Sequence, residues 1–408
     1  MSPGAVTPER CRFLAVDLRY SAEDEAFRAE LRAWLEVAVA AHGPDPGNVD
    51  WPARRAYDTA WQATLHAAGY AGLHWPAQYG GGGASAVRQL VYLEEYARAR
   101  APYISVNFVG LMHAGPTLIA EGTPEQRAAH LPAILRGDEV WCQGFSEPGA
   151  GSDLAALRTR AVRDGDHYVV TGQKIWCTRA QIADYCELLV RTDPDAPKHR
   201  GITWLILPMH SPGVTVRPIR TIDGDDHFCE LFLDDVRVPV THRVGAEHDG
   251  WRVANVTLRF ERGTAFAQHV ITLRAQVGRI VEVAHARRTA TGTLWDDVAL
   301  RRHVGRLTAG LDALWRLTQM CITEADRTGE PAQYGSALKL RYSELGQEIA
   351  ELFVQVVGRT SLALHDFDDL PAREAGKGHL WSLQSTIAAG TSQVQRNLIA
   401  QRILGLPR

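Results

Sequence analysis

Lysine is nearly absent from this 408-residue sequence, whose only lysines are Lys174, Lys198, Lys339 and Lys377. Nearly all of the basic side chains are therefore arginine, which we attribute to coding bias and not to function. The 44 basic and 47 acidic residues leave a formal net charge of −3, and no basic block stands out. A surface for nucleic acid or for an anionic membrane consequently has no electrostatic support.

Cysteine is also sparse, and its spacing is uninformative. The six cysteines form no CxxC pair, so the sequence predicts neither a structural metal site nor a disulfide framework. The first residues lack a basic stretch followed by an apolar core, and no run approaches the roughly 18 apolar residues of a membrane span. We therefore expect a cytoplasmic protein that is neither exported nor embedded in a membrane.

Hydrophobic periodicity divides the chain into three zones, which predict an α+β protein of three domains. Residues 1–138 show helical spacing and form an expected N-terminal helical domain. Residues 139–245 contain short β-branched runs separated by turns, which are typical of an antiparallel β domain. Helical spacing returns in residues 246–408, which we expect to form a C-terminal helical bundle.

Local signals refine these zones. Ser21 with Asp24, and Thr123 with Gln126, have the spacing of helix capping boxes, and Pro124 suits a first helical position. Asp164 and Gly165 predict a hairpin turn. We further expect helices at 54–69, 85–100 and 124–136, a glycine-rich loop at 75–83, and breaks in the last zone at 291–296, 328–333 and 366–378.

The usual catalytic fingerprints are missing, since there is no GxGxxG, P-loop, HExxH or GxSxG. Four other strings stand out. Residues 141–153 read WCQGFSEPGAGSD, residues 172–179 read GQKIWCTR, residues 227–239 read HFCELFLDDVRVP, and residues 389–397 read AGTSQVQRN. By composition alone, the first is an ordinary Gly/Pro/Ser loop, and the tryptophan of the second is an ordinary core residue.

In this order and spacing, the strings resemble those of the acyl-CoA dehydrogenase family, and the resemblance covers nearly the whole chain. It implies a three-domain fold that binds FAD. In the family, a hydroxyl at the position of Ser146 bonds the pyrimidine edge of the flavin, where donors stabilise charge on the reduced ring. Trp176 and Thr178 take the positions of a tryptophan that packs on the flavin and a threonine that reaches its hydride-accepting nitrogen.

The resemblance also implies contacts to the rest of the cofactor. Thr391 and Gln393 correspond to residues at a helix N-terminus that meets the adenosine diphosphate portion, a position that suits an anion. Gln355, Gly358 and Arg301 correspond to residues that reach the cofactor of a neighbouring subunit, although a solvated face explains Arg301 equally well. The expected cofactor-binding residues are Gln143, Phe145, Ser146, Trp176, Thr178, Arg301, Gln355, Gly358, Thr391 and Gln393.

The catalytic base of the family is a carboxylate that takes a proton from the α carbon of the thioester. In many members it directly precedes the Gly-Thr of the fourth string, but here that residue is Ala389. A second branch, which includes isovaleryl and long-chain enzymes, carries the base in a Leu-x-x-Glu-Arg pattern, and residues 258–262 read LRFER. We therefore expect Glu261 to be the base, on a mostly apolar helical stripe whose burial would raise its pKa. Ser152 and Arg262 are the expected substrate-binding residues, and no metal is expected.

The resemblance implies dehydrogenation of an acyl thioester to the trans-2-enoyl thioester, as in fatty acid β-oxidation and related lipid metabolism. Electron-transfer flavoprotein is the expected electron acceptor, and a tetramer or dimer of like or unlike chains is the expected assembly. Acyl length and bulk stay open, as does the choice between CoA and a carrier protein. Two alternatives remain: a flavin-dependent N-oxygenase or nitroalkane oxidase, which Ala389 permits, and a silent subunit of a heteromeric dehydrogenase.

Overall fold

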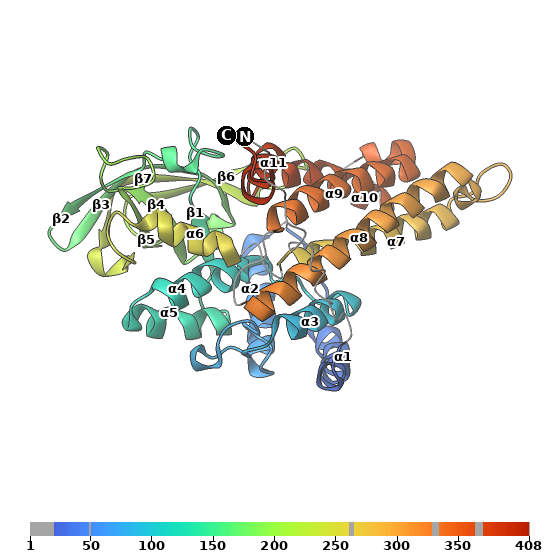
Figure 1. The fold of residues 1–408 in the computed structure, drawn as a ribbon, viewed down its shortest axis with the longest axis horizontal. Helices are drawn as coiled ribbons and strands as arrows, with labels where there is room; N and C mark the ends of the chain where they lie inside the picture. Colours follow the sequence, from blue (N-terminus) through green and yellow to red (C-terminus); the bar gives the residue numbers. More distant parts are fainter. Residues whose placement is uncertain (1–19, 49, 261–264, 329–333, 364–369, 408) are drawn as a thin grey trace, which may run out of the picture.

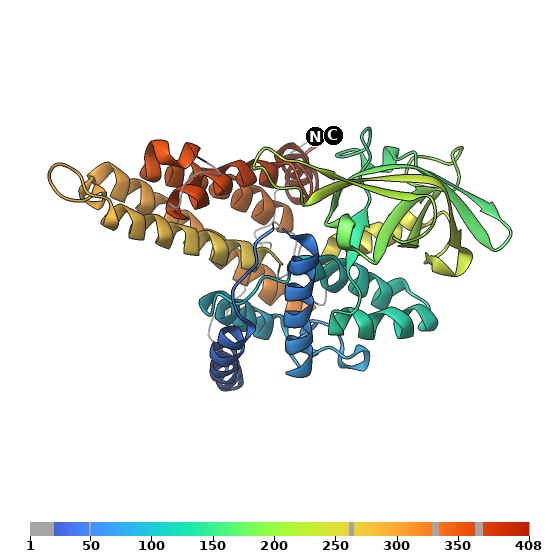
Figure 2. The ribbon, with the colours of Figure 1, turned by 180° about the vertical axis from the view of Figure 1, so that it is seen from behind.

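The computed structural model describes residues 20–48, 50–260, 265–328, 334–363 and 370–407. Figure 1 shows three regions that follow the chain order, with the β sheet at one end, the C-terminal helices at the other, and the N-terminal helices below their junction. Figure 2 shows the same arrangement from behind. This α–β–α order confirms the predicted fold class.

The N-terminal helices begin where the sequence supplies capping groups. The Ser21 hydroxyl accepts from the Asp24 backbone N–H at 3.1 Å, and Thr123 accepts from Gln126 at 3.2 Å. In both cases the third helical residue bonds back to the cap, so both predicted capping boxes are confirmed. The helices of this region are α1 (Ala22–His42), α2 (Trp51–Ala67), α3 (Ala86–Arg98), α4 (Gly115–Glu121) and α5 (Pro124–Arg136).

The middle region is one eight-stranded sheet in the order β6-β7-β3-β2-β4-β5-β8, with β1 paired to β4. Most pairings are antiparallel, as predicted, and Asp164 and His167 face each other across the expected hairpin turn. Two pairings with β4 are parallel. The alternation of side chains along a strand does not reveal this, because it has a period of two in parallel and antiparallel strands alike. The strands are β1 (Trp141–Gly144), β2 (Arg160–Asp164), β3 (His167–Thr178), β4 (Tyr185–Arg191), β5 (Ile202–Pro208), β6 (Val214–Ile219), β7 (Phe228–Pro239) and β8 (Arg243–Val244).

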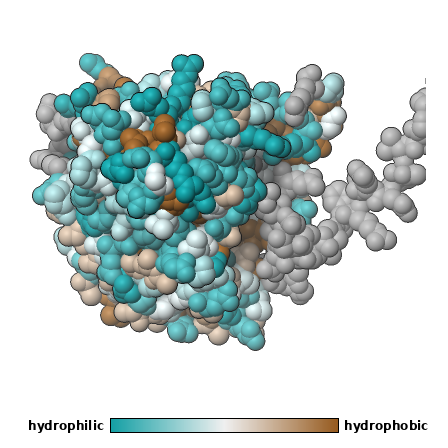
Figure 3. Space-filling model, turned by 90° about the vertical axis from the view of Figure 1, so that its left-hand side faces the viewer, coloured by the Kyte–Doolittle hydropathy of each residue, from teal (hydrophilic) through white to brown (hydrophobic). Residues whose placement is uncertain are grey.

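Alternating strand residues divide the apolar core into two layers. On β5, Trp204 packs into the cluster shared with the N-terminal helices, whereas its neighbour Leu205 packs into a cluster on the other face of the sheet. Both side chains are fully buried. The sheet is therefore packed against side chains on both faces. Figure 3 views the molecule from the end that the sheet forms in Figure 1, and the surface there is mostly hydrophilic with small apolar patches.

The C-terminal region consists of long helices around a third apolar cluster. The break predicted at 291–296 is confirmed by a short turn over Leu294–Asp296. The break predicted at 366–378 is wrong from residue 370 onward, because α10 continues through Gly376 and Gly378 and buries Ala372 and Ala375. That packing outweighs the low helix propensity of glycine. The helices are α6 (Gly250–Phe260), α7 (Ala265–Ala286), α8 (Val298–Thr328), α9 (Gly335–Val357), α10 (Leu370–Ser382) and α11 (Ser392–Leu398).

Candidate active site

The first two strings of the sequence lie against each other. The Ser146 carbonyl oxygen, in the loop after β1, accepts a hydrogen bond from the Ile175 backbone N–H of β3 at 3.0 Å. Phe145 beside it is buried, whereas Ser146 is only half-buried. The structure therefore brings Ser146 beside the C-terminal end of β3, which carries Trp176 and Thr178.

A buried ion pair fixes this junction. The Lys174 ammonium lies 2.8 Å from a Glu147 carboxylate oxygen and donates to the Phe145 carbonyl at 3.1 Å. The same carboxylate accepts the backbone N–H groups of Arg158 and Thr159. Burial lowers the pKa of the Lys174 ammonium, against the opposing charge of Glu147. Burial would raise the pKa of the Glu147 carboxyl, but Lys174 and the N–H donors lower it on balance.

Trp176 is turned outward by a β-bulge. The register of β3 against β7 shifts between Lys174 and Cys177, and Trp176 has a φ of 63°. A non-glycine residue with positive φ is strained, and such strain concentrates at functional sites. The indole is 53% exposed although Lys174 and Cys177 on either side are fully buried. The bulge therefore presents a large aromatic face at the surface of the sheet.

This surface fits a planar cofactor with hydrogen-bonding edges. The Trp176 ring meets Phe228 edge to face at 5.8 Å, and Phe228 lies nearly parallel to Trp381 of α10. Among the described residues, none hydrogen-bonds to the hydroxyl of Ser146 or Thr178, so both remain available to a ligand. An accessible indole beside two available hydroxyls matches what an isoalloxazine ring requires.

The fourth string lies at the start of α11. The Thr391 hydroxyl caps this helix by accepting from the Val394 backbone N–H at 3.2 Å, and Gln393 is exposed. The Gln395 amide donates to the carbonyls of Ala389 and Gly390, which both have positive φ. This turn holds the exposed Gln393 side chain at the surface.

The residues expected to reach a neighbouring subunit lie elsewhere. Gln355 is exposed near the C-terminal end of α9, and Gly358 follows it with a φ of 71°. Arg301 is exposed near the N-terminal end of α8 and donates to the Trp295 carbonyl at 3.2 Å. Figure 1 shows these helix ends at the side of the bundle remote from the sheet. The structure thus separates them from Ser146 and Trp176 of the same chain.

Four further predicted residues remain to be placed. Gln143 is half-buried, and its amide donates to the Glu187 carboxylate at 2.7 Å in the protein interior. Ser152 is exposed in a turn near the end of the first string. Glu261 and Arg262 lie outside the described residues.

A cluster of two aspartates and a histidine, which sequence reasoning did not predict as a site, lies just before β7. Asp223, Asp225 and His227 bring their ligand atoms within 4.8 Å of one another. However, the Lys377 ammonium lies 3.0 Å from an Asp225 carboxylate oxygen and already compensates its charge. A cation at this position would have to displace that ammonium.

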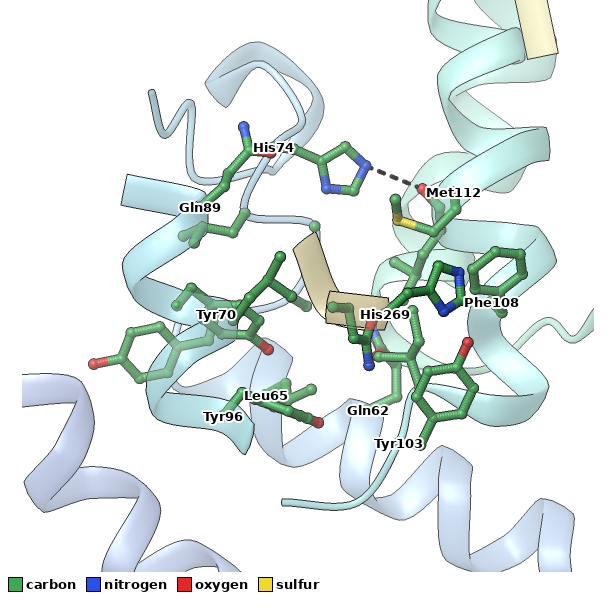
Figure 4. Close-up of a pocket in the computed structure, with 18 residues that line it drawn as sticks. Gln62, Leu65, Tyr70, His74, Gln89, Tyr96, Tyr103, Phe108, Met112 and His269 are labelled. Carbon is green, nitrogen blue, oxygen red and sulfur yellow. Dashed lines mark hydrogen bonds between the residues drawn. The ribbon is translucent and has the colours of Figure 1, made fainter. Parts of the chain in front are cut away.

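A cavity of about 100 Å³ opens between the N-terminal helices and the start of α7 (Figure 4). Its wall is mostly apolar and aromatic, with Leu65, Tyr92, Phe108 and Met112 among the lining residues. Tyr103 also lines it, and Arg179, the residue after Thr178, lies close enough to lower the pKa of the Tyr103 phenol. The cavity is therefore adjacent to the flavin-type surface and suits an apolar substrate group.

Sequence reasoning missed this cavity and the Lys174–Glu147 pair. The position of Lys174 could have indicated the pair. It lies within a predicted strand, and a lysine that is buried in a strand needs an oppositely charged partner. The cavity had no such signal, because its walls come from α2, α3, α7 and the π-helical turn Gly110–Ala114.

The fold and this surface define a helical-β-helical flavin-type dehydrogenase. Comparison with protein families makes the assignment specific. Residues 21–138 match the N-terminal domain of acyl-CoA dehydrogenases, residues 142–236 the middle domain, and residues 248–404 the C-terminal domain. The chain belongs to the acyl-CoA dehydrogenase family, and the protein is an enzyme of this class of FAD-dependent oxidoreductases.

Individual relatives agree with this assignment. The chain is 40% identical to acyl-CoA dehydrogenase IpdE1 of Mycobacterium tuberculosis over 94% of its own length and 98% of that protein. It resembles a chain of the ChsE4-ChsE5 complex of Mycobacterium tuberculosis with a TM-score of 0.81 and 35% identity, covering 96% and 100% of the two chains. The Tcur3481-Tcur3483 steroid ACAD gives a TM-score of 0.79 at 32% identity, covering 96% and 100%. Among the described helices, none combines the length and apolarity that a bilayer crossing requires.

Proposed function

We propose that this protein binds FAD and dehydrogenates the Cα–Cβ bond of a bulky acyl thioester to the trans-2-enoyl thioester, with Glu261 as the base. The observation that carries the proposal is the adjacency of the Ser146, Trp176 and Thr178 surface to the apolar cavity. A substrate whose acyl end lies in the cavity has its thioester end near that surface. Steroid-type acyl groups are favoured because one of the similar structures is described as a steroid ACAD.

Each residue has a defined task in this account. Bound flavin would supply the acceptor for the β hydride. The Ser146 and Thr178 hydroxyls would donate to its edge, and the exposed Trp176 indole would pack against its ring. Glu261 would take the α proton, and the apolar cavity would exclude water from the acyl end. Electron-transfer flavoprotein is the proposed acceptor of the electrons.

We also propose that the active assembly is an oligomer. Arg301 and Gln355 lie at helix ends remote from the Trp176 surface of their own chain, so they would serve the cofactor of another subunit. The similar ChsE4-ChsE5 structure is a complex of two named chains, which favours an unlike partner.

Three measurements test the proposal. The purified protein, alone and co-expressed with candidate partner chains, is expected to be yellow with bound flavin. Anaerobic addition of straight, branched and polycyclic acyl-CoAs is expected to bleach the flavin band with a bulky member, and mass spectrometry should show a product lighter by two hydrogens. Bound flavin that no thioester reduces would favour the oxygenase alternative. Absence of flavin from every preparation would favour the silent subunit.

A further inference from the structure

His269 of α7 lines the cavity, and none of the described residues forms a hydrogen bond with its imidazole ring. The ring is stacked on Tyr342 of α9, with centroids 4.6 Å apart and an interplanar angle of 7°. Within the described part of the chain, no residue hydrogen-bonds to its nitrogens, and the side chain is accessible from the cavity. Stacking thus fixes the ring plane and leaves the nitrogens available to a bound group.

The His269 ring is neutral at physiological pH. The residue keeps an exposed surface, but desolvation by the protein packed around the ring lowers the pKa of the imidazole to about 4. A neutral imidazole offers one donor and one acceptor and no net charge. It can therefore hydrogen-bond an uncharged polar group either as donor or as acceptor.

Tyr103 provides a second hydrogen-bonding group in the same cavity. Its side chain is 43% exposed, and none of the described residues bonds to its hydroxyl. Desolvation by the neighbouring wall raises the pKa of this partly exposed phenol, against the opposing effect of Arg179, so it remains protonated. Figure 4 shows its hydroxyl on the side of the cavity where the His269 ring lies.

Most other polar groups of the wall are already engaged within the protein. His74 donates to the Leu111 carbonyl at 3.2 Å, and the Gln62 amide donates to the Leu135 carbonyl at 2.8 Å. The Tyr96 hydroxyl donates to the Pro102 carbonyl at 2.6 Å. His269 and Tyr103 therefore differ from these neighbours in having no partner among the described residues.

We infer that the acyl cavity selects a ring-bearing acyl group with an uncharged oxygen, a ketone or a hydroxyl, which His269 and Tyr103 bind. This inference rests on the proposed function and assigns its substrate class. The cavity volume far exceeds the roughly 10–15 Å³ that one water needs, so it accommodates several atoms of such a group. An all-hydrocarbon acyl end would displace water from both polar groups without replacing their hydrogen bonds.

The test uses three synthetic thioesters: 3-cyclohexylpropanoyl-CoA and its 4-oxo and 4-hydroxy ring derivatives. With the wild-type holoenzyme, we expect kcat/KM and affinity to favour one oxygenated probe over the hydrocarbon probe by about tenfold. The preferred probe then identifies the group as ketone or hydroxyl. Equal values for all three probes would overturn the inference.

Variants separate recognition from folding. His269→Phe keeps a ring to stack on Tyr342, and Tyr103→Phe keeps the aromatic wall. Each is expected to bring the ratio of kcat/KM for the preferred oxygenated probe to that for the hydrocarbon probe close to one. His285→Phe is the matched control, because His285 is an exposed histidine near the other end of α7 that contacts Trp295. It should retain the wild-type preference, and retention by both cavity variants would overturn the inference.

The outcome distinguishes this inference from the proposed function. If no acyl-CoA of any kind reduces the flavin, the proposed function fails. If the three probes reduce the flavin equally well, the dehydrogenase stands and only the proposed recognition by His269 and Tyr103 fails.

Discussion

At the scale of single residues, the Lys174–Glu147 pair holds together the two segments that present Ser146 and Trp176. Lys174 is fully buried and its ammonium has two oxygen partners, the Phe145 carbonyl and the Glu147 carboxylate. Removing one partner of a buried pair leaves an uncompensated charge, which costs far more than the pair contributes on balance. The pair therefore acts on the shape of the flavin surface without touching the reacting atoms.

Lys174→Met is expected to lower the free energy of unfolding by about 3–5 kcal/mol, because Glu147 remains buried without its cation. Urea unfolding of the holoenzyme measures this loss, and flavin content after gel filtration should fall with it. Lys198→Met is the matched control, because Lys198 pairs with Asp153 at the surface and is 51% exposed. It should cost under about 1 kcal/mol. Equal losses for both variants would contradict the account.

His74 predicts a dependence of stability on acidity. Burial lowers its pKa in the folded protein to about 4, compared with about 6.5 in the unfolded chain. The unfolded state therefore binds a proton first as the pH falls. The stability that neutral His74 supports is complete above pH 6.5 and is lost as the pH falls from about 6.5 toward 4.

His74→Gln should make the melting temperature less sensitive to pH across that window. Melting curves between pH 7.5 and 4.5 measure this sensitivity. His66→Gln, at an exposed position of α2, should keep the wild-type sensitivity. A His74 variant as acid-sensitive as the wild type would refute the assignment.

At the scale of elements, α5 shows how a helix cap also orients a domain. Thr123 caps the helix, and the Gln126 amide donates to the Thr241 and Arg243 carbonyls before β8 and within it. The capping box thus fixes the residue that joins the N-terminal helices to the sheet.

Thr123→Ala is expected to lower the free energy of unfolding by about 1 kcal/mol, whereas Thr123→Ser should retain most of the cap. Denaturant unfolding followed by circular dichroism measures both. An alanine variant as stable as the serine variant would show that the cap contributes nothing measurable.

Elements with local signals were predictable from sequence, and those with nonlocal causes were not. The Ser21 cap and the hairpin at Asp164 each join residues only a few positions apart, so the local spacing in the sequence was sufficient to predict them. The bulge at Trp176 depends on the register of β3 against β7. The helix through Gly376 depends on buried neighbours in α10. Family resemblance predicted Trp176 as a cofactor residue, whereas its strained backbone became visible only in the fold.

At the scale of the whole molecule, the candidate cofactor residues form two separate groups. Ser146, Trp176 and Thr178 lie at the sheet, whereas Arg301 and Gln355 lie at the remote end of the helical bundle. Because these helix ends lie away from the sheet, we propose that the two groups contact cofactors bound to different subunits. Flavin retention should therefore depend on assembly.

Arg301→Ala is expected to weaken flavin retention by about tenfold in the assembled protein if it reaches the cofactor of a neighbour. Flavin dissociation during dialysis, with light scattering to verify the assembly, measures this effect. Arg302→Ala changes the adjacent exposed arginine and should behave as the wild type. Unchanged retention in the Arg301 variant would assign that side chain to the solvated face.

The most direct test of the central claim is anaerobic reduction of the bound flavin by the preferred acyl-CoA in wild type and Glu261→Gln. The wild type is expected to bleach on mixing, whereas Glu261→Gln should bind the thioester and slow bleaching by at least about a hundredfold, the size of a typical general-base contribution. Glu282→Gln, at an exposed glutamate of α7, is the matched control and should bleach as the wild type does. Bleaching of Glu261→Gln at the wild-type rate would contradict the account.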